Sequence, residues 1–94
     1  MENKEVIAEV KRNLSPNYDV EDCTSFGEKG EWRISIWKRR VGRCSHSYSI
    51  TKWRETNKGH CKRMFQLFEG RNGQTLSFKS LEDACIEILR DGGD

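Results

Sequence analysis

Apolar residues recur at helical spacing near the N-terminus. The four positions are Val6, Ile7, Val10 and Leu14. They stand in a charged background and follow the period of one face of an α-helix. Pro16 comes two positions later and disfavours helical conformation in the residue before it. The pattern predicts a helix near residues 3 to 14.

A second helical pattern lies near the C-terminus. Its apolar positions are Leu81, Ala84, Cys85, Ile88 and Leu89. Ser80 followed by Asp83 resembles a capping box in which Asp replaces the usual Glu. The segment 91–93, Asp-Gly-Gly, is typical of a helix end. We expect a helix near residues 81 to 90.

The middle of the chain changes to a period of two, which is typical of strands with one apolar face. Residues 32 to 39 alternate first, with Trp32, Ile34 and Ile36 on one side and Arg33, Ser35, Trp37 and Arg39 on the other. After a turn near Gly42 the alternation resumes, with Cys44, His46, Tyr48 and Ile50 opposite Ser45, Ser47, Ser49 and Thr51. Two strands are therefore predicted, each with a polar face.

Two further strands are expected from residues 62–69 and 74–79. Phe65 and Leu67 point inward in the first, with Phe68 opposite, while Leu76 and Phe78 point inward in the second. The dipeptide at 72–73, Asn-Gly, lies between them and is a strong hairpin signal, because both turn positions must accept positive φ. Residues 18–26 fit either a short strand or an extended connection.

These elements predict an α+β fold: an antiparallel three- or four-stranded meander with an N-terminal and a C-terminal helix packed on one face. The 94 residues leave no room for two separate cores, so we expect a single domain over residues 1–94. The other face of the sheet would then be open to a partner.

Charge is distributed unevenly along the chain. Residues 33–63 contain ten basic residues against one acid, a local net charge of +9, whereas residues 1–32 carry −4 and residues 64–94 carry −3. A basic segment of this kind, interleaved with Trp37, Tyr48 and Trp53, concentrates positive potential where a polyanion can be held. The pattern indicates nucleic-acid binding; its alternatives are a solvated face of a small domain and a basic patch for an acidic protein partner.

The predicted binding residues come from the polar sheet face and from basic loops, which we expect to gather beside one another. Arg and Lys neutralise phosphates, Ser and Thr donate to phosphate oxygens, and an exposed indole stacks on bases. We expect Lys79 and Thr75 to extend the polar face. The candidate set is Arg33, Trp37, Arg39, Arg40, Arg43, Lys52, Trp53, Arg54, Lys58, Lys62 and Arg63.

The expected function is that of a small non-enzymatic module that binds DNA or RNA. The alternative is a protein-binding inhibitor or adaptor, phage or mobile-element encoded, that uses the same patch against an acidic protein surface. In a third interpretation Trp37 and Trp53 are covered by the first helix or by a dimer partner, and the arginines only shield them. A register error of one residue would exchange the two faces.

Metal binding and catalysis have weaker support. Cys44, His46, His60 and Cys61 are chemically able to hold tetrahedral zinc, but their spacing fits no standard finger or knuckle. The two histidines are also the candidates for acid–base catalysis of RNA cleavage, with nothing to position them together. We therefore expect no metal, no cofactor and no enzymatic activity.

The order of elements is similar to that of a double-stranded-RNA-binding domain, with residues 16–26 where such domains pass from helix to sheet. That family begins its second helix with a phosphate-gripping lysine cluster, whereas residues 80–83 here read Ser-Leu-Glu-Asp. The basic meander followed by a helix also resembles the sheet-in-groove DNA-binding domains of some integrases and plant transcription factors. These resemblances cover topology and the Arg/Trp face, and they assign no family.

The remaining expectations concern the surroundings of the protein. No stretch approaches the roughly 20 apolar residues of a membrane span, and the acidic start lacks the regions of a signal peptide. We therefore expect a cytoplasmic protein without membrane contact, whose four cysteines are reduced. An exposed edge strand and surface Trp residues also suggest a homodimer.

Overall fold

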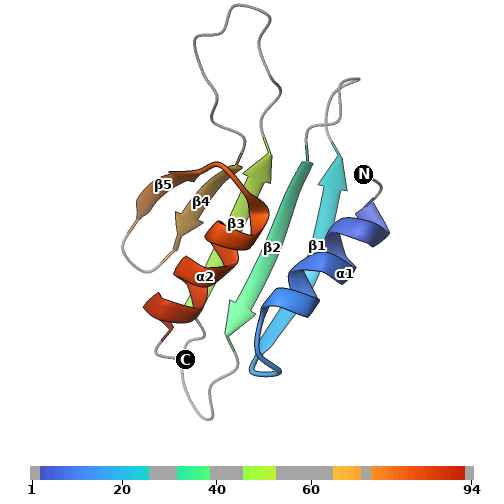
Figure 1. Cartoon of the computed structure of the whole chain (residues 1–94), viewed down its shortest axis with the longest axis horizontal. Helices are drawn as coiled ribbons and strands as arrows, with labels where there is room; N and C mark the ends of the chain where they lie inside the picture. The colour runs from blue at the N-terminus through green and yellow to red at the C-terminus, as the bar shows by residue number, and fades with distance from the viewer. Residues whose placement is uncertain (1–2, 26–31, 39–45, 53–64, 71–72, 93–94) are drawn as a thin grey trace, which may run out of the picture.

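The computed structural model describes residues 3–25, 32–38, 46–52, 65–70 and 73–92. The elements, shown in Figure 1, are α1 (Asn3–Asn13), β1 (Tyr18–Ser25), β2 (Trp32–Lys38), β3 (His46–Lys52), β4 (Phe65–Glu69), β5 (Gln74–Phe78) and α2 (Leu81–Asp91). The strands form one antiparallel sheet in the order β1-β2-β3-β4-β5. The fold is α+β, as the sequence predicted.

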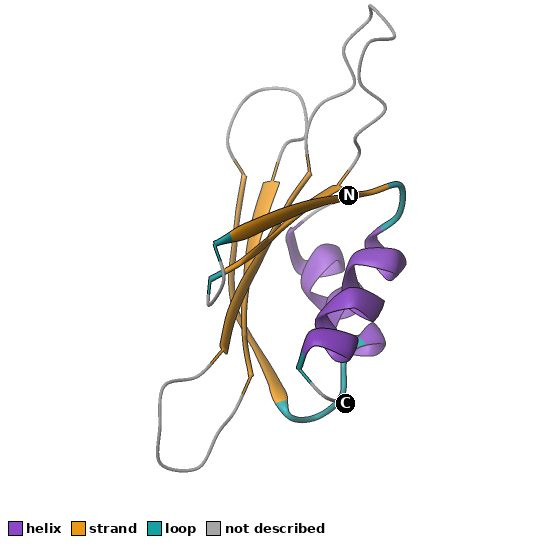
Figure 2. Cartoon of the chain, turned by 90° about the vertical axis from the view of Figure 1, so that its left-hand side faces the viewer, coloured by secondary structure: helices purple, strands orange, loops and turns teal. Residues whose placement is uncertain are grey.

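Both helices lie on the same face of the sheet, and no described element covers the other face (Figure 2). Helix α1 packs mainly on β1, and α2 packs on β4, β5 and α1. Each helix turns its apolar face toward the inward side chains of the strands, which removes apolar surface from water. The core is formed by Val6, Val10, Leu14, Tyr18, Cys23, Trp32, Ile34, Ile36, Tyr48, Ile50, Phe65, Leu67, Leu81, Ala84, Cys85 and Ile88.

The sheet has one strand more than the upper number predicted, and the additional strand is β1. Its register with β2 shifts between Val20 and Asp22, so that Glu21 forms a bulge. Tyr18 and Val20 face the helices before the bulge, and Cys23 faces them after it. Because a bulge inserts one residue into one strand of a pair, it interrupts the period of two. The pattern of residues 18–26 was ambiguous for this reason.

The N-terminus of α2 has the predicted cap. The Ser80 side chain accepts a hydrogen bond from the backbone N–H of Asp83 at 3.1 Å, and Ser80 itself has extended backbone angles. At the other end, the backbone N–H of Gly92 donates to the carbonyl of Ile88. One backbone N–H at the start of α2 and one carbonyl at its end are therefore satisfied by residues that the sequence indicated.

The β4–β5 hairpin has most of the expected inward side chains, although Leu76, the register partner of Leu67, is not part of the buried core. Phe65 and Leu67 are buried, Phe78 packs against the core, and Gly73 has a φ of +64°, a conformation that favours glycine. Glu69 is only 2% exposed and lies opposite Tyr48 in the register. The burial of Glu69 was not predicted, because only apolar residues were assigned to the core from the alternation of the strand.

The C-terminal end of α2 is tied to the sheet by a group of polar contacts. The Tyr48 hydroxyl donates to the Asp91 carboxylate at 2.7 Å, and the Tyr18 hydroxyl donates to the Ile88 carbonyl at 3.3 Å. Lys38 Nζ donates to the Gly92 carbonyl and lies 5.8 Å from the centre of the Tyr18 ring. Burial, together with the Asp91 carboxylate, raises the pKa of Tyr48 above its ordinary value.

Candidate nucleic-acid interface

The uncovered sheet face is built from every second residue of the strands. Because side chains alternate across a strand, the residues between the core positions all point away from the helices. The register arranges them in rows that run across the sheet. One row is Thr24, Arg33, Thr51, Gln66 and Ser77, the next contains Ser35, Ser49, Phe68 and Thr75, and the third contains Asp19, Trp37 and Ser47.

Two large aromatic side chains stand on this face. Trp37 is 36% exposed and Phe68 is 44% exposed. They belong to β2 and β4, and their register partners on β3 are Ser47 and Ser49. The interpretation in which the first helix covers Trp37 is therefore wrong, because α1 lies on the opposite face (Figure 2). An exposed aromatic pair among hydroxyl groups is a surface on which planar rings can stack.

Arg33 is held against the sheet by its neighbour in the row. Its Nε donates to the Thr51 hydroxyl at 3.1 Å, and Thr51 is only 5% exposed. This hydrogen bond restrains the guanidinium group beside β3. Arg33 also forms one wall of a hollow of about 240 Å³, whose other lining residues are Ser49, Thr51, Gln66, Phe68 and Thr75.

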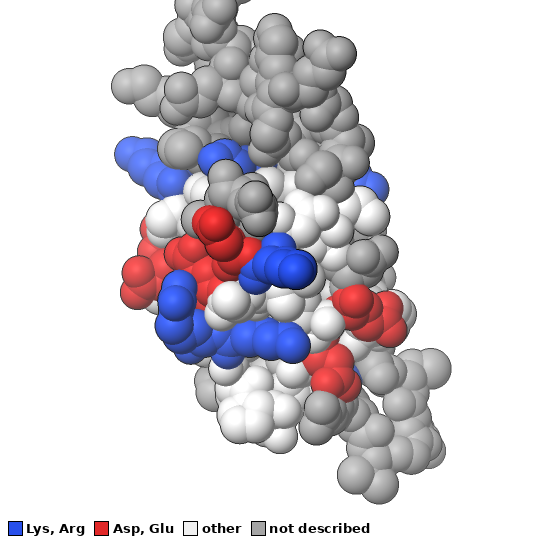
Figure 3. Space-filling model, turned by 90° about the vertical axis from the view of Figure 1, so that its right-hand side faces the viewer, with Lys and Arg blue, Asp and Glu red and all other residues white. Residues whose placement is uncertain are grey.

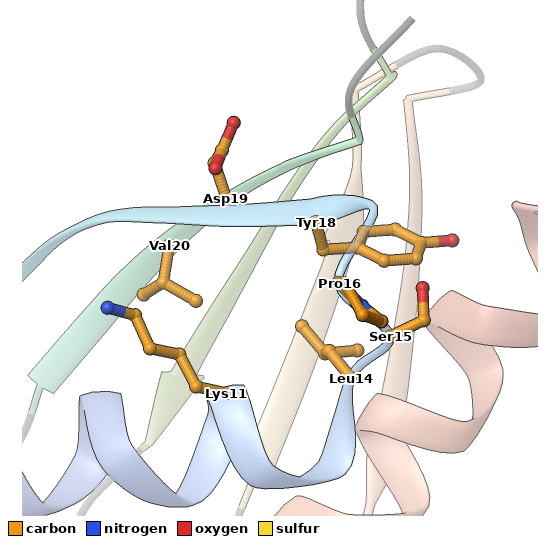
Figure 4. Close-up of a pocket in the computed structure, with 7 residues that line it drawn as sticks. All are labelled: Lys11, Leu14, Ser15, Pro16, Tyr18, Asp19 and Val20. Carbon is orange, nitrogen blue, oxygen red and sulfur yellow. The ribbon is translucent and has the colours of Figure 1, made fainter.

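The β1 edge of the same face is acidic. The indole N–H of Trp37 donates to the Glu21 carboxylate at 2.6 Å, so the bulge residue reaches over to β2. Asp19 is the register partner of Trp37 and points away from α1, as Figure 4 shows. These carboxylates repel phosphate groups. A bound polyanion would therefore lie over β2, β3 and β4 and avoid β1.

The described part of the open face has fewer cations than predicted. Arg33 is the only basic residue that the described strand segments place on it. Lys52 Nζ lies 5.8 Å from the centre of the Phe65 ring on the helix-covered side, so its assignment to the same patch as Trp37 is not supported. Lys38 also lies on the helix-covered side, where its Nζ donates a hydrogen bond to the Gly92 carbonyl.

The two basic segments, expected beside one another, continue from opposite ends of the described β2–β3 pair. Residues 39–45 follow Lys38, and residues 53–64 follow Lys52. Lys38 pairs with His46 and Lys52 pairs with Trp32, so the two lysines mark opposite ends of the β2–β3 pair. At about 3.3 Å per residue, these ends are roughly 20 Å apart. The two segments therefore leave the sheet at points too distant to form one cluster at their origins.

Other hollows of the surface gather less binding chemistry. One of about 190 Å³ is lined by Trp32 and Phe65, with Lys52 and Lys79 among the residues around it. Lys79 was expected on the open face, but this hollow is on the helix side. Another, of about 330 Å³, lies between the end of α1 and the start of β1, where Lys11 is beside Val20 (Figure 4). Around α1 and β1, acidic and basic side chains are interspersed, without a field of one sign (Figure 3).

The remaining predicted site residues lie outside the described residues. They are Arg39, Arg40, Arg43, Trp53, Arg54, Lys58, Lys62 and Arg63. Cys44, His60 and Cys61 of the zinc hypothesis do so as well, and the side chain of His46 is not described. Among the side chains that are described, no three His, Cys, Asp or Glu residues are grouped as metal ligands.

Sequence reasoning placed Phe68, Gln66 and Thr51 on the side of the sheet away from the core but did not include them in the candidate site. Phe68 had been placed opposite the core side of its strand but was not recognised as an exposed partner of Trp37. Gln66 and Thr51 were not recognised as lining a hollow with Arg33. Strand alternation was a sufficient signal for Phe68, whereas the hollow depends on the register between β2, β3 and β4.

Comparisons with known proteins add no further identification. No protein-family model matches the chain, and neither a curated protein nor a solved structure is found to match it. Within the segments that the structure describes, neither helix is long and apolar enough to cross a membrane. Function is therefore argued from the open face itself.

Proposed function

We propose that this protein is a non-enzymatic module that binds single-stranded nucleic acid, DNA or RNA, across the open face of its sheet. The observation that carries the proposal is the exposure of Trp37 and Phe68 on one uncovered face. Exposed aromatic rings on a sheet are the usual platforms for unpaired bases, because every base has a π-face. Arg33 and the surrounding hydroxyl groups supply contacts to phosphate, sugar or base edges.

The separation of the two rings fits two different bases of one strand. Trp37 and Phe68 are two strands apart and displaced by two residues along them. With strands about 4.8 Å apart and about 3.4 Å per residue, the diagonal is about 12 Å between backbone positions. This distance is too long for the rings to sandwich one base. Each ring would therefore stack on its own base.

The charge on the described face favours a single strand over a duplex. A protein that grips duplex backbone needs many cationic contacts to phosphates. The described strands place one arginine on this face and leave carboxylates at its β1 edge. Stacking supplies about 1–3 kcal/mol per base without such contacts. An unpaired strand is thus the better match to what the face presents.

The basic segments of the sequence would add long-range attraction. Residues 39–43 include three arginines, and residues 54–63 include four basic residues. They are connected to the sheet at its two ends, beyond Lys38 and Lys52. The positive charge of these segments would attract a polyanion over a long range and raise the association rate at low salt.

The test is a titration with single-stranded and double-stranded oligonucleotides of equal length at several salt concentrations. We expect tighter binding of the single strand, and weakening with salt that reflects the phosphate contacts. Trp37→Ala and Phe68→Ala should each reduce affinity about 5- to 150-fold, the equivalent of 1–3 kcal/mol. The control is Ile86→Ala, which truncates a 52% exposed side chain on α2 and should leave affinity unchanged.

Two outcomes would reject the proposal. Absence of oligonucleotide binding at low salt would remove nucleic acid as the partner. A stoichiometric complex with an acidic protein that survives nuclease treatment, together with that absence, would establish the inhibitor or adaptor function instead. Unfolding of Trp37→Ala would affect only that variant, because Phe68→Ala tests the same face from another strand.

A further inference from the structure

The hollow beside Arg33 is lined by an aromatic ring, a guanidinium group and uncharged polar groups. Its volume is about 240 Å³, and four strands, β2 to β5, contribute to it. Phe68 and Arg33 supply an aromatic ring and a guanidinium group. The other lining residues carry only hydroxyl or amide groups: Ser49, Thr51, Gln66 and Thr75.

Two neighbouring rows of the sheet form the floor. Arg33, Thr51 and Gln66 are consecutive in one row. The second row runs through Ser49 and Phe68 to the next strand, so the phenyl ring stands beside the polar groups of the first row. At 44% exposed, Phe68 presents much of its surface to a ligand. A planar molecule stacked on that ring would have its edge above the polar row.

The Arg33 side chain is oriented by a hydrogen bond before any ligand binds. Its Nε–H donates to the Thr51 hydroxyl, which restrains the guanidinium group, and Thr51 is almost completely covered. An arginine held in this way loses less side-chain entropy when it binds than a free surface arginine does. Arginine also has five N–H donors and no acceptor, whereas hydroxyl and amide groups can both donate and accept. The hollow is consequently richer in donors near Arg33.

We propose that this hollow is a subsite for one unpaired nucleobase with a carbonyl oxygen at the edge that it presents: guanine, thymine or uracil. The proposal rests on the proposed function and adds base preference to it. The base stacks on Phe68, and its carbonyl oxygen accepts hydrogen bonds from Arg33, the Gln66 amide and the hydroxyl groups. Adenine presents an exocyclic amino group at the same edge. That group meets the donors of Arg33, so adenine is disfavoured.

The probe is a matched pair of single-stranded oligonucleotides. One contains adenines, and in the other several adenines are replaced by hypoxanthine, which has a carbonyl in place of the amino group. We expect the hypoxanthine strand to bind at least about fivefold more tightly. Oligo(dT) should likewise bind more tightly than oligo(dA) of the same length. Equal affinity for both members of each pair would overturn the subsite.

Variants separate base recognition from phosphate binding. Gln66→Leu removes the amide, and Arg33→Lys keeps the charge but removes the planar fork; each should reduce the preference while binding persists. Preference unchanged in Arg33→Lys would mean that the arginine contacts phosphate, and would overturn its role here. Ser77→Ala is the control, since this exposed residue lies in the same row but does not line the hollow.

The two proposals fail in different ways. If no oligonucleotide binds, the proposed function itself is wrong. If both members of each pair bind with one affinity and Phe68→Ala weakens them equally, the face binds single strands and the subsite is rejected. Thermal melting of each variant identifies any loss of folding, and Gln66→Leu and Arg33→Lys provide independent readings from separate strands.

Discussion

Trp37 and Glu21 are joined by a hydrogen bond of 2.6 Å from the indole nitrogen to the carboxylate. Glu21 reaches this position because it is the bulged residue of β1. The contact holds the indole in one orientation on the open face, and it also places a negative charge beside a surface proposed to bind a polyanion. The same residue therefore positions the ring and weakens phosphate attraction near it.

Glu21→Gln should increase affinity for a single-stranded oligonucleotide about two- to fivefold at low salt. The glutamine side-chain oxygen can still accept from the indole, while the negative charge is removed. Fluorescence anisotropy at low and high salt measures the change, which should shrink as salt rises. Glu5→Gln is the matched control, because it makes the same charge change on α1, on the other side of the sheet. A lower affinity of Glu21→Gln would contradict the proposal that the bound nucleic acid lies over β2, β3 and β4 and avoids the acidic β1 edge.

Ser80→Ala should lower the free energy of unfolding by about 1 kcal/mol. The serine side chain satisfies the Asp83 backbone N–H at the start of α2, and alanine leaves that donor without its cap. For a chain of this size the expected fall in Tm is about 4–8 °C. Ser77→Ala on β5 is the comparison and should change Tm little. Similar Tm values for the two variants would show that the cap contributes nothing measurable.

Gly92→Ala should destabilise the protein by about 1–3 kcal/mol through overcrowding. A Cβ at position 92 would collide with the Tyr18 hydroxyl, which is buried against the end of α2. Tyr18→Phe removes that oxygen and should recover part of the loss in the double variant. Chemical denaturation of the single and double variants measures this coupling. Additive losses would mean that the collision is relieved by movement elsewhere.

Stability should decrease as pH rises above about 9. Burial, and then the carboxylates of Glu9 and Glu82, raise the pKa of Cys85 from 9.0 to about 12. Tyr48 is shifted in the same direction from 10.0, mainly by burial. A raised folded-state pKa means that the folded protein binds more protons than the unfolded chain in this range. The contribution is therefore complete below the unfolded pKa and is lost as pH approaches the folded one.

The pH dependence can be assigned by substitution. Each group contributes a slope of at most about 1.4 kcal/mol per pH unit. Cys85→Ala should remove the part that begins near pH 9, and Tyr48→Phe the part that begins near pH 10. Unfolding midpoints measured from pH 7 to 12 provide the test. An unchanged slope in both variants would exclude these two groups as its source.

The elements that follow a simple period were predictable. Both helices, the inward faces of β2 and β3 and the Ser80 cap agree with the sequence, because they depend on residues close together in the chain. Strand β1 was ambiguous because the bulge at Glu21 breaks its alternation. The count of three or four strands was too low for that local reason.

The candidate site was predictable only in part. Alternation correctly placed Arg33 and Trp37 away from the helices. Grouping residues by charge, however, joined Lys52 to them, although it lies over Phe65 on the helix-covered side. A count of charge along the chain does not show which face of the sheet each side chain occupies. Because side chains alternate between the two faces of a strand, basic residues of one charged segment lie on opposite faces.

By itself, the sequence determined which segments are helical or extended and which side of most strands is apolar, because these properties follow from local periodicity. Only the tertiary structure decided that Glu21 bonds to Trp37, that Arg33 rests on Thr51 and that Phe68 completes a hollow with them. These contacts join positions that are distant in the chain. Their formation depends on the register of β1 to β4, and a shift of one residue would turn each side chain to the opposite face.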